Sequence, residues 1–384
     1  MKRAKTLCGA LLVAASISLI SSASAAHPGR NGLIAYADGA AIYSIYPDGS
    51  HKTKLTKPTY DTQYATLHLD AAAYPKWSPN GKKIAFVASM TQLPGGEQDT
   101  SVVVMDSDGS DLHWISNSGV KGAISWSPDG SHIAYLREAY IGSLDRVLEI
   151  ANANGVGVTT LRVRGELSDP AWSPDGHTIV FGETNPRTLE AVDADGSHQR
   201  TLIHEMTVRH LDWSPDGTKL LFDDRQAEGG GGTVYSANAD GSNVRPLNQD
   251  DPAWGYMASW SPDGTKIVLT VQASDFTESI KYLKPDGTVQ GLAFGPVSGA
   301  MPNWQPCGLG ARCPDTTPCV VPRVTGLSLT RARTALRKAH CVVGTMKRQR
   351  HVALGKAVVS RQSPRPKTRL PNGGKVNLVL RPRR

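Results

Sequence analysis

The residues capable of catalysis do not form any of the common linear motifs. Gly295-Pro296-Val297-Ser298-Gly299 resembles a nucleophile elbow, but its serine is misplaced for G-x-S-x-G. The sequence also lacks an H-E-x-x-H pair, a Walker loop and a G-x-G-x-x-G turn. We therefore expect a non-enzymatic protein with no catalytic residue, no cofactor and no metal.

Two aspartate-rich segments resemble the start of a calcium-binding loop. They are Asp106-Ser107-Asp108-Gly109-Ser110 and Asp193-Ala194-Asp195-Gly196-Ser197. The twelfth loop position, where calcium requires a bidentate Glu, holds Asn117 in one and His204 in the other. Related Asp-Gly phrases recur along the chain, so we interpret both segments as turns, with calcium binding as the alternative.

The cysteines near the C-terminus form a second group with possible chemistry. Cys307, Cys313, Cys319 and Cys341 permit three pairings, and we predict Cys307–Cys313 and Cys319–Cys341. A zinc site is the alternative, although C-x5-C-x5-C lacks the close C-x2-C pair of common zinc sites.

Charge is divided unevenly along the 384 residues. Residues 321–384 contain 17 Lys and Arg and no acidic residue, whereas residues 27–320 contain 22 cations and all 34 acids, a formal charge of −12. Such a tail binds polyanions through counterion release, and the alternative is a solvated cationic surface without a ligand. The residues that we assign to polyanion or wall binding are Arg348, Arg350, Arg365, Lys367, Arg369, Arg381, Arg383 and Arg384.

The first 26 residues read as an export signal. Lys2, Arg3 and Lys5 precede an apolar stretch of about Leu7–Ile20, and Ala23-Ser24-Ala25 forms an A-x-A cleavage site. An uncleaved anchoring helix is the alternative. We expect export to the periplasm, cell wall or extracellular space, no later transmembrane segment, and no nucleic-acid partner.

The main body of the chain is a repeat. Six tryptophans (Trp77, Trp126, Trp172, Trp213, Trp260 and Trp304) recur at spacings of 49, 46, 41, 47 and 44 residues. Five of them begin a Trp-Ser-Pro-Asp/Asn-Gly phrase followed by an apolar strand, as in Trp126–Gly130 before Ile133-Ala134-Tyr135. Pro and Gly at these positions favour a tight turn, so the phrase predicts a hairpin.

A second turn phrase, such as Ala239-Asp240-Gly241-Ser242, alternates with the first. Each repeat therefore reads as four short strands in about 45 residues, which is typical of a propeller blade. The copy at Trp304 is incomplete, and Asn31–Tyr36 reads as its missing half. We predict a six-bladed β-propeller over residues 27–306 whose N-terminal strand completes the last blade, and we assign the six tryptophans a structural role.

The repeated phrase resembles that of the TolB-like propellers, over roughly residues 29–306. The resemblance implies a six-bladed all-β ring that binds a partner on one face or at its central channel.

The tail after a Cys/Pro linker at residues 307–320 resembles a PASTA domain, a small α+β fold. Val321-Pro322, Gly326, Ala332 and Leu336 match the first half of its pattern, and Gln362-Ser363-Pro364 and Gly374–Leu378 match the second. We predict strands at 320–324, 341–345, 358–362 and 376–380 and a helix beginning at Leu327 or Ser328. The resemblance implies association of residues 321–384 with bacterial peptidoglycan.

Together these features predict a monomeric, exported binding or scaffold protein of the bacterial cell envelope. Its propeller would bind a protein or glycan, and its tail would associate with peptidoglycan or an anionic wall polymer. The alternative is a hydrolase or lyase in which acids and His of the propeller channel act on a sugar polymer or lactone.

Overall fold

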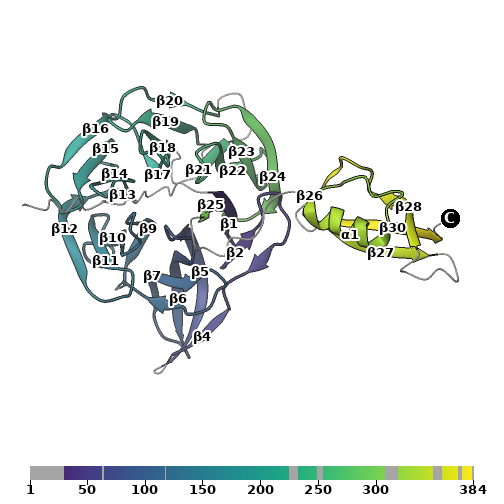
Figure 1. The fold of residues 1–384 in the computed structure, drawn as a ribbon. Helices are drawn as coiled ribbons and strands as arrows, with labels where there is room; N and C mark the ends of the chain where they lie inside the picture. The colour runs from purple at the N-terminus through teal and green to yellow at the C-terminus, as the bar shows by residue number, and fades with distance from the viewer. Residues whose placement is uncertain are drawn as a thin grey trace, which may run out of the picture.

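The computed structural model describes residues 30–62, 65–116, 118–224, 232–248, 254–307, 319–348, 357–370 and 374–382. The predicted signal peptide and residues 308–318 of the predicted linker lie outside the described residues. Described residues up to Cys307 form six antiparallel sheets of four or five strands. Figure 1 shows these sheets arranged as a ring around a central axis. The predicted all-β propeller is confirmed, and the sheets are consistent with six blades.

Each sheet is named here after the repeated tryptophan of its innermost strand. The Trp77 sheet contains β4 (Thr59–Asp61), β5 (Thr66–Trp77), β6 (Lys83–Leu93), β7 (Gln98–Asp106) and β8 (His113–Trp114). The Trp126 sheet contains β9 (Val120–Trp126), β10 (His132–Glu138), β11 (Arg146–Asn152) and β12 (Val158–Gly165). The Trp172 sheet contains β13 (Leu167–Trp172), β14 (Thr178–Glu183), β15 (Thr188–Asp193) and β16 (Arg200–His204).

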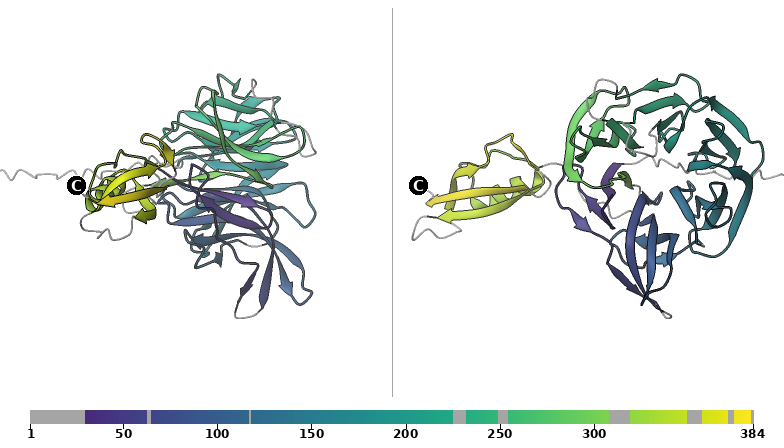
Figure 2. Two further views of the ribbon diagram at one scale, coloured as in Figure 1. Left: turned by 90° about the vertical axis from the view of Figure 1, so that its right-hand side faces the viewer. Right: turned by 180° about the vertical axis from the view of Figure 1, so that it is seen from behind.

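Three further sheets complete the ring. The Trp213 sheet contains β17 (Arg209–Trp213), β18 (Lys219–Asp223), β19 (Val234–Asn238) and β20 (Arg245–Pro246). The Trp260 sheet contains β21 (Trp254–Trp260), β22 (Ile267–Gln272), β23 (Glu278–Leu283) and β24 (Val289–Val297). The Trp304 sheet contains β25 (Asn303–Cys307), β1 (Arg30–Asp38), β2 (Ala41–Ile45) and β3 (Thr53–Lys54). Figures 1 and 2 show the Trp77 sheet projecting beyond the outline of its neighbours.

The Trp-Ser-Pro-Asp-Gly phrase folds as a hairpin turn for identifiable reasons. Ser127 donates its hydroxyl to Asp129 Oδ1 at 2.6 Å and accepts the backbone N–H of His132 at 2.9 Å. Asp129 Oδ1 in turn accepts the N–H of Ser131 at 3.0 Å. Gly130 has φ 72°, a left-handed conformation that favours glycine.

These turns make stability sensitive to acid. Burial raises the pKa of Asp129. Hydrogen bonds from Ser127 and Ser131 together lower it by more than burial raises it, so the net pKa lies below its usual value. Asp175, Asp216 and Asp263 show the same balance. A depressed carboxylate pKa contributes stability above the unfolded value of about 3.9, and this stability is lost as the pH falls through the folded pKa.

We therefore expect the melting temperature to fall steeply between about pH 4 and pH 2, where these turn carboxylates become protonated. Asp129→Asn should weaken this dependence while keeping the turn, because the first repeat already uses Asn80, whose Oδ1 accepts the Ser78 hydroxyl at 2.9 Å. Melting curves of both proteins from pH 6 to pH 2 test this (an identical acid limb would contradict it).

The core consists of apolar clusters between neighbouring sheets. Between the Trp126 and Trp172 sheets, Leu136 and Leu148 of the first pack with Trp172 and Phe181 of the second. Each of the six interfaces contains one repeated tryptophan, and all six are at most 7% exposed. The tryptophans therefore fill the gaps between blades, where a bulky ring buries the most apolar area.

The ring closes between the two ends of the repeat. Strand β1 pairs antiparallel with β25, with Arg30 opposite Cys307 and Ile34 opposite Trp304, as the split repeat predicts. Gln305 stands where the other copies have Ser, and it is 2% exposed. Its Oε1 accepts the N–H of Leu33 at 3.1 Å and its Nε2 donates to Gly81 O at 2.8 Å, so it joins β1 to the first repeat's turn.

Gln305→Ser restores the repeated phrase and is nevertheless expected to lower the free energy of unfolding by about 1–3 kcal/mol, because it leaves the buried Gly81 carbonyl and the half-buried Leu33 N–H without their side-chain partner. Urea denaturation measures the change. Ser261→Thr in the adjacent repeat, which keeps a hydroxyl, serves as the control, and equal effects of the two substitutions would contradict the assigned role of Gln305.

The C-terminal domain is a separate small α+β unit. Strands β27 (Cys341–Arg348), β30 (Gly374–Pro382) and β28 (Ala357–Ser363) form one sheet, and β26 (Cys319–Val320) pairs with β29 (Arg369–Leu370). Helix α1 (Leu329–Lys338) begins after Ser328, which accepts the N–H of Arg331, and buries Leu329, Ala332 and Leu336 against the sheet. A disulfide joins Cys319 to Cys341, as predicted. No helix in the described part of the chain is long and apolar enough to span a membrane.

One predicted strand of this domain is shorter than expected, and one predicted disulfide lies partly outside the described residues. The strand expected at 320–324 is wrong beyond Val320, because Pro322 has no N–H and Val321 bonds instead to Thr368 and Lys367. Cys307 is disulfide-bonded, but Cys313 lies outside the described residues, so the Cys307–Cys313 pair stays a prediction.

Candidate functional site

The C-terminal domain contains a basic groove of about 820 Å³. Arg323, Arg361, Arg365 and Lys367 line it, and all four are exposed. Within the described residues none of these cations forms an ion pair with a carboxylate, which follows from the absence of acidic residues after Val320. The groove therefore presents unneutralised positive charge to solvent.

Hydrogen bonds of one side chain and of the backbone join the segments that line the groove. Gln362 accepts the N–H of Val324 at 2.7 Å and donates to Pro322 O at 2.9 Å, so one side chain joins the two walls. Val321 donates to Thr368 O at 2.9 Å and Lys367 donates its N–H to Val321 O at 2.8 Å. The cations therefore project from a fixed backbone.

The structure separates the predicted wall-binding residues into two groups. Arg365 and Lys367 line the groove, and Arg369 lies nearby on β29, opposite Val320. Arg348 and Arg381 lie toward the other end of the sheet, where Arg348 is opposite Leu380. Arg350, Arg383 and Arg384 lie outside the described residues. Arg323 and Arg361 complete the groove and were not singled out from sequence.

In the propeller, charged residues gather at one mouth of the central channel. The channel-mouth cluster consists of Tyr74 on β5, Asp169 on β13, His210 on β17 and Asp223 on β18. His210 Nδ1 lies 2.8 Å from Asp223 Oδ2, and its Nε2 lies 3.9 Å from Asp169 Oδ2. The Tyr74 ring stacks on His210 with centroids 6.2 Å apart.

Three members of this cluster occupy the same bulged position, three residues before the repeated tryptophan. Tyr74, Asp169 and His210 have φ of 53°, 35° and 51°, and the strand register shifts at each. A bulge turns a side chain away from the regular alternation of the strand, and bulges are common near binding sites. Here they direct the side chains toward the channel axis.

Hydrogen bonds from this cluster connect four consecutive sheets. Asp169 accepts the N–H of Ala123 at 2.8 Å and of His210 at 2.9 Å, and Asp223 accepts the N–H of Met257 at 2.8 Å. Burial lowers the pKa of His210. The carboxylates of Asp223 and Asp169 together raise it by more than burial lowers it, so the net pKa lies above its usual value. Burial raises the pKa of Asp169, but the charge of His210 and two backbone N–H groups leave it lowered.

The cavities along the channel are small. One of about 30 Å³ lies beside Tyr74, His210, Met257 and Met301, and another of about 50 Å³ is lined by the six repeated tryptophans. Volumes of this size suit a few water molecules. Within the described ranges, no group of three or more His, Cys, Asp or Glu is placed to hold a metal.

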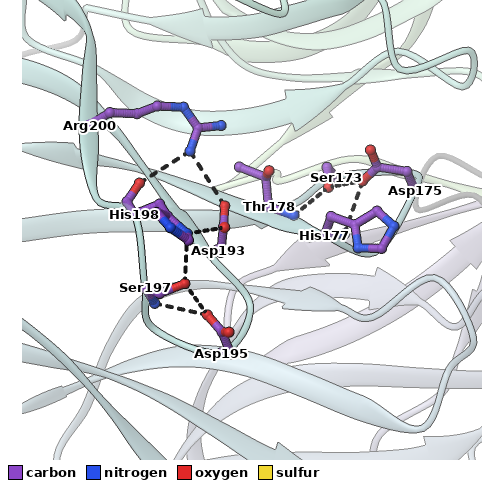
Figure 3. Close-up of polar contacts among 9 residues, drawn as sticks. All are labelled: Ser173, Asp175, His177, Thr178, Asp193, Asp195, Ser197, His198 and Arg200. Carbon is purple, nitrogen blue, oxygen red and sulfur yellow. Dashed lines mark hydrogen bonds and ion pairs between the residues drawn. The ribbon is translucent and has the colours of Figure 1, made fainter.

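One surface arrangement superficially resembles a catalytic triad. Figure 3 shows Ser197, His198 and Asp193 in contact, with Ser197 Oγ 2.9 Å and Asp193 Oδ2 2.9 Å from His198 Nδ1. A triad needs the serine and the carboxylate on opposite ring nitrogens, whereas here both face Nδ1. Similar Ser–His contacts recur at His51 and His132. Turn formation therefore accounts for the arrangement.

Sequence reasoning missed the channel-mouth cluster. His210 belongs to no sequence motif, and its side chain is 11% exposed between two carboxylates. An alignment of the repeats on their tryptophans would have shown Tyr74, Asp169 and His210 at equivalent positions.

These observations define the class of protein: a β-propeller of six sheets followed by a small α+β domain with a basic groove. A family model of the TolB beta propeller domain matches residues 83–309, which is more than half of the chain. The chain therefore belongs to the TolB beta propeller family, and its C-terminal part matches a PASTA domain at residues 320–382.

Comparison with individual proteins supports the same fold. The chain superposes on TolB from Acinetobacter baumannii with a TM-score of 0.55 and 18% identity, covering 72% of this chain and 67% of that one. A chain of a nidogen/laminin complex gives a TM-score of 0.51 and 12% identity, covering 71% and 98%. Dipeptidyl-peptidase 5 of Porphyromonas endodontalis is 26% identical over 138 residues, which is 35% of this chain and 20% of that protein. The chain thus spans about a fifth of the length of that curated relative.

Proposed function

We propose that this is an exported, non-enzymatic binding protein of the bacterial cell envelope. Its PASTA domain associates with peptidoglycan or an anionic wall polymer through the basic groove, and its propeller binds a protein or glycan partner. The groove carries the proposal: at about 820 Å³ it has the size of a ligand site, and four exposed cations line it. Disulfide formation between Cys319 and Cys341 is in keeping with an oxidising compartment outside the cytoplasm.

The propeller is assigned to binding because of the size and chemistry of its channel. The cavity beside His210 has a volume of about 30 Å³, which is small for a polymer or lactone. The match to a dipeptidyl-peptidase covers only 35% of this chain and is the observation that favours a hydrolytic role. Peptidase and glycosidase assays with the intact protein test that alternative, and turnover abolished by His210→Asn would replace the binding role.

A charge-matched pair of variants tests the groove. We expect Arg365→Ala/Lys367→Ala to weaken binding to purified cell walls about tenfold, which corresponds to about 1.4 kcal/mol, because two cations of the groove are lost. Arg348→Ala/Arg381→Ala removes the same charge from the other end of the sheet and should cost less. Co-sedimentation across a salt series gives both affinities. Equal losses in the two variants would indicate nonspecific attraction to the whole tail.

A further inference from the structure

The three-stranded sheet of the C-terminal domain is covered by α1 on one face (Figure 1). On its central strand, β30, the residues that pack with α1 are at most 1% exposed: Val376, Leu378 and Leu380. Successive side chains of a strand point to opposite faces. The residues of β30 on the other face are all exposed: Lys375, Asn377, Val379 and Arg381. We call this second face the open face.

The two outer strands place one cation on each side of Val379. Arg361 of β28 and Lys347 of β27 are both register partners of Val379, and both are exposed. Residues opposite each other in neighbouring strands share a face, so both cations lie on the open face, with Cα atoms about 10 Å apart across two strand spacings. Arg348 is opposite the buried Leu380 and therefore lies on the helix side of the sheet.

The open face is continuous with the basic groove, because Arg361 belongs to both. Arg361 lines the groove together with Arg365 and Lys367. We call this series of cations, from Lys367 through Arg365 and Arg361 to Lys347, the basic track. No acidic residue of the domain can neutralise it, since residues 321–384 contain none. Several cations in series suit a linear ligand that carries several negative charges.

The composition of the domain restricts the chemistry of that ligand. Residues 321–384 contain no Phe, Trp or Tyr. Nucleobases and the flat faces of sugar rings are bound by stacking on aromatic side chains, and the basic track has no such ring. It offers charge and, at Val379 (36% exposed), an aliphatic surface between two cations. A chain of phosphate groups joined by short ring-free polyol units matches this alternation, because Arg and Lys both bind phosphate.

We propose that the basic track binds a linear polyol phosphate polymer, which enters the groove at Lys367 and crosses the open face to Lys347. This inference rests on the proposed wall-binding role of the groove and assigns its ligand to the phosphodiester polymers of the wall rather than to peptidoglycan. A second copy of the domain is a poor occupant of the open face, since it would bring like charges together.

The first test uses the full chain and purified cell walls that contain polyol phosphate, before and after cold hydrofluoric acid removes their phosphodiester polymers. We expect binding at least about tenfold weaker to the stripped walls. Equal binding to both preparations would overturn this inference and leave the proposed wall-binding role in place. Absence of binding to either would overturn both.

The second test compares glycerol phosphate dimers with long glycerol phosphate chains as probes. Long chains should bind at least about tenfold more tightly, because only they reach beyond the groove. Lys347→Gln should weaken binding of long chains about threefold, reduce the slope of log K against log salt by about one, and leave dimer binding unchanged. Arg348→Gln is the matched control, since it removes the neighbouring charge from the helix side and should have a smaller effect.

The remaining outcomes identify other ligands or occupants. Equal effects of Lys347→Gln and Arg348→Gln would indicate diffuse attraction to the whole domain and overturn the track. Tighter binding of polygalacturonate, a carboxylate polymer of sugar rings, than of glycerol phosphate chains would overturn the phosphate assignment. If the acidic propeller occupied the open face, Lys347→Gln would leave polymer binding unchanged or strengthen it, which would also overturn the proposal.

Discussion

Deletion of residues 27–40 should abolish folding or lower the melting temperature by more than about 15 °C. Strand β1 lies between β25 and β2, so its loss leaves two unpaired strand edges at the point of closure. Ile34 and Tyr36 are 0% and 1% exposed and pack with Trp304. Burying each side chain contributes about 1.5–3 kcal/mol, and the lost strand pairing adds to this, against a total stability of about 5–15 kcal/mol.

A point variant shows whether the effect of the deletion comes from the lost contacts of β1 rather than from shortening the chain. Ile34→Ala should cost about 2–5 kcal/mol in urea denaturation, because it opens a cavity in the last interface. Val156→Ala, at a residue that is 69% exposed, is the control and should change the free energy of unfolding by less than about 0.5 kcal/mol. A deletion variant that melts like the intact protein would show that β1 does not close the ring.

The parts of the fold that depend on local chemistry could be predicted from sequence. Residues such as Asp129 and Gly130 determine their turn through contacts within a few positions, so each repeat indicated its own hairpin. The split copy at Trp304 even indicated the long-range pairing of β1, because its missing half has the same pattern. The disulfide between Cys319 and Cys341 was also predicted, as a bond that ties the first strand of the tail to the end of its helix.

The channel-mouth cluster was not predictable in this way. Asp169, His210 and Tyr74 belong to different repeats, and none forms a spacing motif. They meet because equivalent bulges in inner strands from different sides of the ring face one axis, which requires the closed ring and its register. The groove cations illustrate the same limit, since Arg323 and Arg361 are 38 positions apart in sequence and adjoin the same cavity only in the folded domain.

Replacing Asp169 with Ala is expected to lower the free energy of unfolding by about 3–5 kcal/mol, because it removes one of the two carboxylates beside buried His210 and leaves two backbone N–H groups without their acceptor. The Asp169 side chain is 6% exposed and bonds the backbone N–H groups of Ala123 and His210, so it ties three sheets together. Urea denaturation at neutral pH measures the effect. Asp195→Ala is the matched control: this exposed turn residue bonds only Ser197, and its loss should cost about 1 kcal/mol or less.

The pH dependence of Asp169→Asn identifies the origin of this stability. The raised pKa of His210 contributes stability below its unfolded value of about 6.5, and this is lost as the pH rises through the folded pKa. The lowered pKa of Asp169 contributes above about 3.9 and is lost as the pH falls through its folded value. Asp223, Arg209 and Tyr74 remain in both proteins. The stability difference between wild type and Asp169→Asn should therefore be largest from about pH 4 to pH 7 and decrease at alkaline pH. A difference that stays constant from pH 5 to pH 9 would assign the stabilisation to the backbone hydrogen bonds of Asp169 rather than to its ion pair with His210.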